Sequence, residues 1–123
     1  MKDKINIKAG EGRFQIEVQA LRCGEDWCVA VYGGEKPHVG AVSLGQYEPE
    51  RGSATVSTVT VYTHRDDVIA AQFAKAVAAA RRCTAAVSAG IHVDAAGEAE
   101  LAMLRAVSDR CLHTLLRAME EDE

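Results

Sequence analysis

The chain has 123 residues, of which 48% are hydrophobic and 26% are charged, a composition typical of one globular domain with its own core. Its formal net charge is −4, from 14 basic and 18 acidic residues, and lysine and arginine do not gather into a basic patch. These features argue against nucleic-acid binding, and the lack of a long apolar run argues against a membrane-spanning segment.

The start of the chain and its cysteines predict a cytoplasmic protein. Residues 1–8 carry charges but lack the apolar core of a signal peptide. The four cysteines (Cys23, Cys28, Cys83 and Cys111) form neither a C-x-x-C pair nor a zinc-knuckle spacing. Cys28 and Cys111 lie in apolar patterns, where cysteine usually behaves as a small buried hydrophobe. Four cysteines could form two disulfides, but reduced thiols are the expectation for the cytoplasm.

Hydrophobic periodicity predicts strands in the first part of the chain. Residues 14–21 alternate between apolar and polar, which is typical of a half-buried strand, and a short strand around Ile5 and Ile7 precedes them. Residues 27–32 are nearly all apolar and predict a central strand covered on both faces. Residues 39–44 resume as a strand.

A loop and a further strand follow. Residues 45–53 contain a proline, a glycine and several charges, and predict an exposed loop. Residues 54–62 are rich in valine and threonine and predict a strand. Their apolar phase shifts part of the way along, which indicates a bulge near Ser57.

The chain then predicts a helix with favourable charges at both ends. Thr63 followed by Asp66 resembles a capping box, and Asp66 and Asp67 would lie in the first turn. Arg81 and Arg82 would lie in the last turn, where the helix dipole favours cations. The many alanines between them favour helix and allow close packing on a sheet.

The remaining residues predict one more strand and one more helix. Residues 83–89 form a short apolar strand that ends at a glycine–histidine junction, 89–94. Asp94 or the small residues after it would cap the last helix. We therefore predict a single α+β domain over residues 1–123, with residues 1–10 and 120–123 frayed. Its mainly antiparallel sheet would have about five to six strands, with two helices packed on one face.

The segment V-Y-G-G-E-K-P-H-V-G-A-V, residues 31–42, is the most informative part of the chain. Its paired glycines, proline and two apolar flanks are typical of a hairpin connection between two strands. A hairpin has no need of the lysine or of the histidine between a proline and a glycine. The alternative is a ligand-binding loop that uses Lys36 and backbone N–H groups to hold a phosphate or an aromatic ring.

Three of the four histidines (His38, His64 and His92) lie at predicted junctions, where loops often carry function, and His113 lies in mid-helix as a structural residue. An open zinc site is a minor alternative, since no H-x-H or H-E-x-x-H spacing supports it. No G-x-S-x-G motif is present, and Asp66 and Asp67 are explained as helix charges. We therefore predict no catalytic residue and no metal, but binding of an anionic small molecule.

Three motifs in order support a family resemblance: G-G-E-K-P-H-V-G at 33–40, T-H-R-D-D at 63–67 and A-G-I-H-V-D at 89–94. Together they resemble the LpdD-type prenylated-flavin chaperones, the small accessory subunits of gallate and other UbiD-type decarboxylases. The resemblance runs from about Phe14 to the final helix.

The resemblance implies a non-catalytic protein that binds reduced prenylated FMN, with FMN as a further candidate ligand, and delivers it to a UbiD-type decarboxylase apoenzyme. Glycines would let the backbone approach the flavin, while basic residues would offset its phosphate. The implied cofactor-binding residues are Gly33, Gly34, Lys36, Pro37, His38, Gly40, His64, Arg65, Gly90 and His92.

Two other functions remain open from the sequence. The chain could be a catalytic or regulatory decarboxylase subunit that uses His38, His64 and His92 as acid–base groups. It could also be a structural assembly module in which the motifs only build turns and a dimer face. Exposed strand edges in so small a chain further predict a homodimer.

Overall fold

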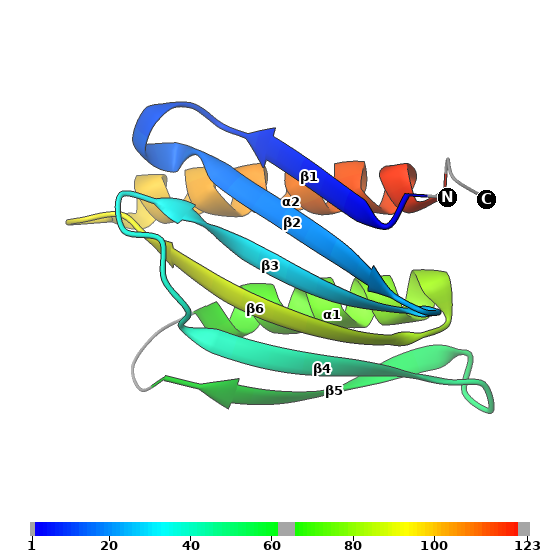
Figure 1. The fold of residues 1–123 in the computed structure, drawn as a ribbon. Coiled ribbons are helices and arrows are strands. Elements are labelled where there is room, and N and C mark those ends of the chain that lie inside the picture. Colours follow the sequence, from blue (N-terminus) through cyan, green and yellow to red (C-terminus); the bar gives the residue numbers. More distant parts are fainter. Residues whose placement is uncertain (1, 62–65, 121–123) are drawn as a thin grey trace.

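The computed structural model describes residues 2–61 and 66–120. They form a six-stranded sheet in the order β1-β2-β3-β6-β4-β5, with two α-helices behind one face (Figure 1). This confirms the predicted α+β fold. The elements in chain order are β1 (Lys4–Ala9), a short 3-10 helix η1 (Gly12–Phe14), β2 (Ile16–Cys23), β3 (Asp26–Gly34), β4 (Ala41–Glu48), β5 (Ser53–Thr60), α1 (Asp66–Arg81), β6 (Thr84–His92) and α2 (Glu98–Glu120).

Strand β6 lies between β3 and β4, so the hairpin interpretation of residues 31–42 is wrong. Strand β6 pairs parallel with β3 and antiparallel with β4, and the other pairs are antiparallel. A parallel partner needs a long crossover connection, which the chain makes through β4, β5 and α1. Strands β3 and β4, neighbours in sequence, are therefore separated in space by the last strand.

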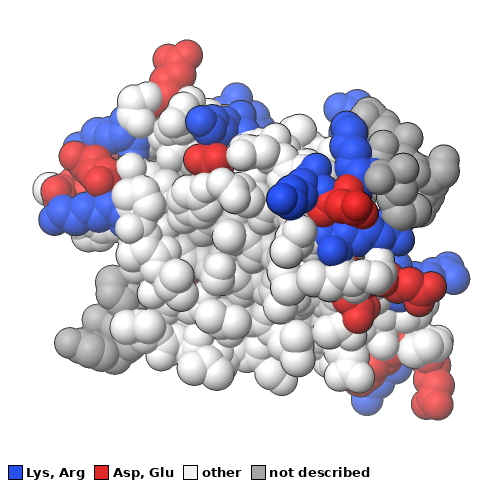
Figure 2. Space-filling model, viewed as in Figure 1, with Lys and Arg blue, Asp and Glu red and all other residues white. Residues whose placement is uncertain are grey.

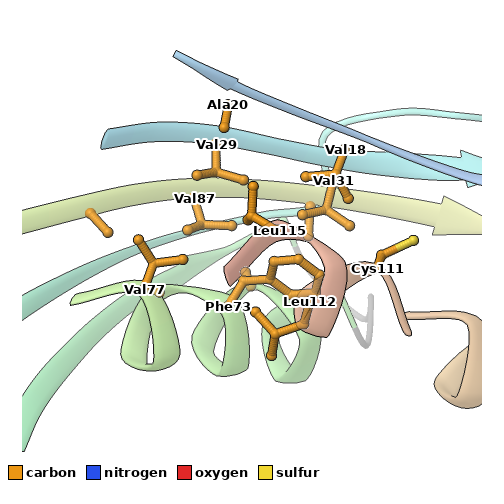
Figure 3. Packing of buried hydrophobic residues seen from close by; sticks show 14 of the residues in the cluster. Val18, Ala20, Val29, Val31, Phe73, Val77, Val87, Cys111, Leu112 and Leu115 are labelled. Carbon is orange, nitrogen blue, oxygen red and sulfur yellow. The ribbon is translucent and has the colours of Figure 1, made fainter. Parts of the chain in front are cut away.

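The core lies between the sheet and the two helices. Alternate residues of each central strand point toward the helices, as strand geometry requires (Figure 3). Helix α1 packs on β4, β5 and β6, and α2 packs on β1 and β2. Core side chains with less than 2% exposure include Ile16, Val18, Val31, Phe73, Val77, Val87, Val107, Cys111 and Leu115.

The alanine-rich sequence of α1 serves a close approach to β4. Ala70, Ala74 and Ala78 are all buried. A Cβ added at Gly45 of β4 would overlap the Ala74 carbonyl oxygen and lie 3.2 Å from the Ala78 Cβ. Small residues on both elements thus let the helix backbone almost touch the strand, which confirms the close packing predicted from the alanines.

Only one face of the sheet is covered by helices. The prediction that residues 27–32 are covered on both faces is therefore wrong for this chain, and so is the predicted burial of Cys28. The burial of Cys111 is confirmed. We call the uncovered side the open face. Its middle is formed by Leu21, Cys28, Ala30, Val42, Leu44, Val59, Ala86 and Ser88.

Several predicted boundaries differ from the structure. Phe14 lies in η1 and not in the following strand. Residues 45–48, predicted as loop, continue β4 because they pair with β5 in unbroken register, and no bulge occurs at Ser57. Strand β6 extends past Ala89 to His92, so the second glycine–histidine segment belongs to a strand. Thr63, and with it the predicted capping box, lies outside the described residues.

We expect the cysteines to differ sharply in reactivity. Burial raises the pKa of the Cys83 thiol to about 11 and also raises the pKa of Cys111. Only the thiolate reacts rapidly, so neither should be alkylated by iodoacetamide at pH 8 while the protein is folded. Exposed Cys23 is the internal control and should react at once. Peptide mapping by mass spectrometry measures each site, and fast labelling of Cys83 without denaturant would contradict the expectation.

The raised pKa of the Cys83 thiol also makes the stability of the folded protein depend on pH. A folded-state pKa above the unfolded value means that the folded chain binds the Cys83 proton more tightly. The contribution of the Cys83 thiol to the free energy of unfolding is therefore complete below its usual pKa and is lost as the pH rises toward about 11. Urea unfolding at pH 8 and pH 10.5 should show a smaller alkaline loss of stability for Cys83→Ala than for the unchanged protein.

Candidate functional site

The connection between β3 and β4 lies along the last residues of β6. The Glu35 N–H donates to the His92 carbonyl oxygen at 2.7 Å, and the Gly40 N–H donates to the Ala89 carbonyl oxygen at 2.8 Å. Between them the His38 N–H donates to the Gly90 carbonyl oxygen at 3.4 Å. The structure therefore brings the first and third sequence motifs together, although about fifty residues separate them along the chain.

The motif glycines make room for the chain's own atoms. A Cβ at Gly90 would overlap the His38 carbonyl oxygen, and one at Gly34, where φ is +76°, would overlap the His92 carbonyl oxygen. A Cβ at Gly40 would overlap the Asp66 carboxylate, and one at Gly33 would overlap the Gln15 carbonyl oxygen. These glycines have a packing role that the sequence analysis did not foresee; their predicted contact with a flavin stays a prediction.

Asp66 joins the three elements that meet at this end of the sheet. It begins α1 and is buried, with 5% exposure. Its Oδ1 accepts a hydrogen bond from the Ile91 N–H at 3.0 Å, and its Oδ2 lies 3.0 Å from His38 Nε2. One carboxylate thus ties the start of α1 to β6 and to the β3–β4 connection.

His38 is held at both ring nitrogens. Its Nδ1 lies 2.9 Å from the Lys36 carbonyl oxygen, and its Nε2 contacts the Asp66 carboxylate. Carbonyl and carboxylate oxygens only accept hydrogen bonds, so the ring nitrogen that carries a proton is the donor in either contact. The ring therefore lies between the Lys36 backbone and the buried Asp66 carboxylate.

A second cluster of polar and charged side chains is centred on Asp94. Its carboxylate lies 2.9 Å from His92 Nε2 and 3.4 Å from Lys36 Nζ. The hydrogen bond from His92, followed by the nearby Lys36 ammonium, lowers the pKa of Asp94. Of the two predicted caps of α2, Asp94 is wrong and a small residue after it is confirmed. Helix α2 begins at Glu98, and the Glu100 carboxylate accepts the N–H of the preceding Gly97 at 2.7 Å. Lys36 and His92 are thus brought together, both at an exposed carboxylate.

An apolar cleft opens beside these residues. It has a volume of about 690 Å³ and lies between the beginnings of α1 and α2 and the end of β6. Asp66 and His92 line it, and its other walls are mainly aliphatic. Ligand sites are commonly apolar clefts of this size with a few polar groups at fixed positions. Besides Asp66 and His92, the residues that line the cleft include Val68, Ile69, Ile91, Val93, Leu101, Leu104 and Arg105.

Arg105 is the lining residue that the sequence analysis missed. It is exposed on α2 and forms no hydrogen bond or ion pair that the structure shows within residues 2–61 and 66–120. The only trace of it in the sequence is its place one turn after Leu101 on the apolar side of the helix. Nothing in that pattern separates it from the other arginines of α2.

The remaining predicted residues fall in different places. Pro37 lies in the exposed part of the β3–β4 connection. His64 and Arg65 lie outside the described residues. Within residues 2–61 and 66–120, no group of three or more histidine, cysteine or acidic side chains is arranged to hold a metal ion. In the same part of the chain, no helix has the length and apolar character that a membrane span requires.

Comparison with known proteins assigns the family. No curated protein sequence matches the chain. In fold it is similar to a solved chain from a chaperone complex for yeast 20S proteasome assembly. That similarity has a TM-score of 0.61 and 13% identity, over 91% of this chain and 93% of that one. Residues 10–120 match the model of the prenylated flavin chaperone LpdD-like domain. The match spans nearly the whole chain and confirms the resemblance seen in the three motifs: this protein belongs to the prenylated flavin chaperone LpdD-like family.

Proposed function

We propose that this protein binds reduced prenylated FMN, without transforming it, and delivers it to a UbiD-type decarboxylase apoenzyme in the cytoplasm. The family match supports the chaperone role and the class of cofactor. A carrier must hold its ligand and also release it, so it needs a preformed and open site. The cleft between the starts of α1 and α2 has that character.

The observation that carries the proposal is the chemistry of this cleft. Prenylated FMN combines an anionic phosphate with a flat aromatic system and an added apolar ring. The aliphatic walls suit the ring system, and the Arg105 guanidinium supplies hydrogen-bond donors for an anion. The residues present therefore fit the cofactor. Lys36, beside His92 across Asp94, would add positive charge at the same end of the sheet.

A binding measurement tests the proposal directly. Under anaerobic conditions, the protein should retain reduced prenylated FMN through desalting and then raise the activity of an apo-decarboxylase. Arg105→Gln should weaken retention at least ~10-fold, because hydrogen bonds to charged groups contribute about 1.5–3 kcal/mol. Arg110→Gln, which removes an exposed arginine outside the cleft on the same helix, is the matched control.

Two results would contradict the proposal. The first is the absence of saturable binding by the folded protein, and the second is equal loss of retention in both arginine variants. The first result would favour a structural assembly module. The packing of the motif glycines against the chain's own backbone is the observation that favours this second candidate.

A further inference from the structure

Two exposed cysteines lie together at the end of the β2–β3 hairpin. Cys23 Sγ lies 3.6 Å from Cys28 Sγ, whereas Cys83 and Cys111 are buried. In the strand register Leu21 is paired with Cys28, and Cys23 follows Leu21 by two residues on the same strand. Alternate residues of a strand share a face, so both exposed thiols project from the open face of the sheet.

This end of the hairpin lies at the rim of the open face. Figure 2 views that face and shows white atoms over its middle, with charged groups gathered at its edges. The segment between the two cysteines contributes Glu25 and Asp26, both of them exposed. Charged side chains keep water and small polar solutes in contact with the rim. The Cys23 thiol is therefore open to a small reactant from solution.

Packing does not account for this pair. A cysteine that serves as a small hydrophobe is buried, as Cys83 and Cys111 are, and Cys23 and Cys28 are not. Two sulfur atoms 3.6 Å apart need to approach by only about 1.5 Å to reach the length of a disulfide bond. Disulfides of cytoplasmic proteins are usually transient, and they serve catalysis or redox sensing.

We propose that Cys23 and Cys28 are a reversible disulfide site, oxidised by a low-molecular-weight disulfide of the glutathione class. The hairpin holds the two thiols side by side before the oxidant arrives, so closing the bond is an intramolecular step. The proposal does not depend on flavin binding.

The oxidation proceeds in two exchange steps. The Cys23 thiolate attacks one sulfur of the small disulfide, whose S–S bond breaks and releases one small thiolate. The Cys28 thiolate then attacks the Cys23 sulfur of this mixed disulfide, forms the Cys23–Cys28 bond and releases the second small thiolate. The two protons lost by the cysteines go to the two small thiolates. Two protein thiols are thus oxidised while one small disulfide is reduced to two thiols.

The environment of Cys28 supports this division of roles. Its hydrogen bond with Cys23, followed by burial, raises the pKa of the Cys28 thiol. Only the thiolate attacks, so Cys28 is a slow nucleophile toward a reactant from solution. In the second step it attacks a sulfur that is already held beside it, and this proximity offsets the raised pKa. Cys23 is therefore the attacking residue and Cys28 the resolving residue.

Mass spectrometry of the oxidised protein tests the proposal. After incubation with excess oxidised glutathione, the folded chain should lose two hydrogen atoms and keep no glutathione. A glutamate-specific protease cuts after Glu25, between the two cysteines, and the two peptides should stay linked until dithiothreitol is added. Cys28→Ser should keep glutathione on Cys23 at a level at least ~10-fold above that of the unchanged protein, because no second thiol displaces it. Cys83→Ala removes a buried thiol and is the matched control, which should form the same link as the unchanged protein.

Four results would overturn the proposal. The unchanged protein could keep as much glutathione on Cys23 as Cys28→Ser does, or could lose no thiols at all. Cys28 could link to a second chain, which a non-reducing gel shows as a covalent dimer. The Cys23–Cys28 link could also form only after circular dichroism shows that the chain has unfolded. Recovery of both thiols after dithiothreitol, with the fold unchanged throughout, is the result expected for a reversible site.

Discussion

Replacing Gly90 with alanine should destabilise the fold by about 3 kcal/mol, the upper part of the range for overpacked sites. The added Cβ would overlap the His38 carbonyl oxygen and lie 3.0 Å from the Val39 backbone nitrogen. Both are backbone atoms, which cannot swing away as the end of a flexible side chain can. The β3–β4 connection would have to leave β6, and the hydrogen bonds that hold it there would be lost.

Urea unfolding measures this effect, with Gly97→Ala as the control. A Cβ at Gly97 would approach only the Glu100 carboxylate, at 3.1 Å, and that side chain can move. The control should cost about 1 kcal/mol or less, the usual effect of alanine at a helix N-cap. Equal losses in the two variants would mean that the close contact between Gly90 and the connection does not support the fold.

Asp66→Ala should be the next most damaging substitution, with an expected loss of about 3 kcal/mol. It removes the acceptor of the partly buried Ile91 N–H and the carboxylate that faces His38. Asp67→Ala is the control, because Asp67 lies in the same first turn but is only partly buried. Loss of its interaction with the helix dipole should cost about 0.3–1 kcal/mol.

A double-mutant cycle separates the His38 contact from the rest of the Asp66 effect. If the two side chains interact as their 3.0 Å distance indicates, the losses for Asp66→Ala and His38→Ala should not add. The double variant should be more stable than the sum of the single losses predicts, by about 1 kcal/mol or more. Strict additivity would show that the pair contributes nothing beyond its separate partners.

The sequence identified only part of the candidate site, because residue type and short-range spacing do not reveal which distant residues meet in the fold. Gly90 and His38 were marked by residue type alone, and the structure places them in contact. The role of Asp66 was assigned to the helix dipole, since its bonds to Ile91 and His38 depend on residues 25 and 28 positions away. Arg105 was missed because helix position says nothing about which cleft a side chain lines.

The fold, too, was predicted only in part from the sequence. Alternation indicated the strand that became β2, since one buried face imposes that pattern whatever the strand order is, while apolar runs and β-branched residues indicated most of the others. It could not find the place of β6, because the same alternation suits a strand at any position in the sheet. Continuous β4–β5 pairing across residues 45–48 also overrode the polar composition that predicted a loop there.

By itself, the sequence determined the α+β class, the two helices and the family motifs, because each depends on residue type and short-range spacing. Only the tertiary structure decided that the first motif is not a hairpin. Strand β6 arrives by a crossover and takes the place between β3 and β4. The motif glycines then allow the β3–β4 connection to pack on the end of β6. One face of the sheet is left uncovered by helices. These are long-range packing outcomes, which local spacing does not specify.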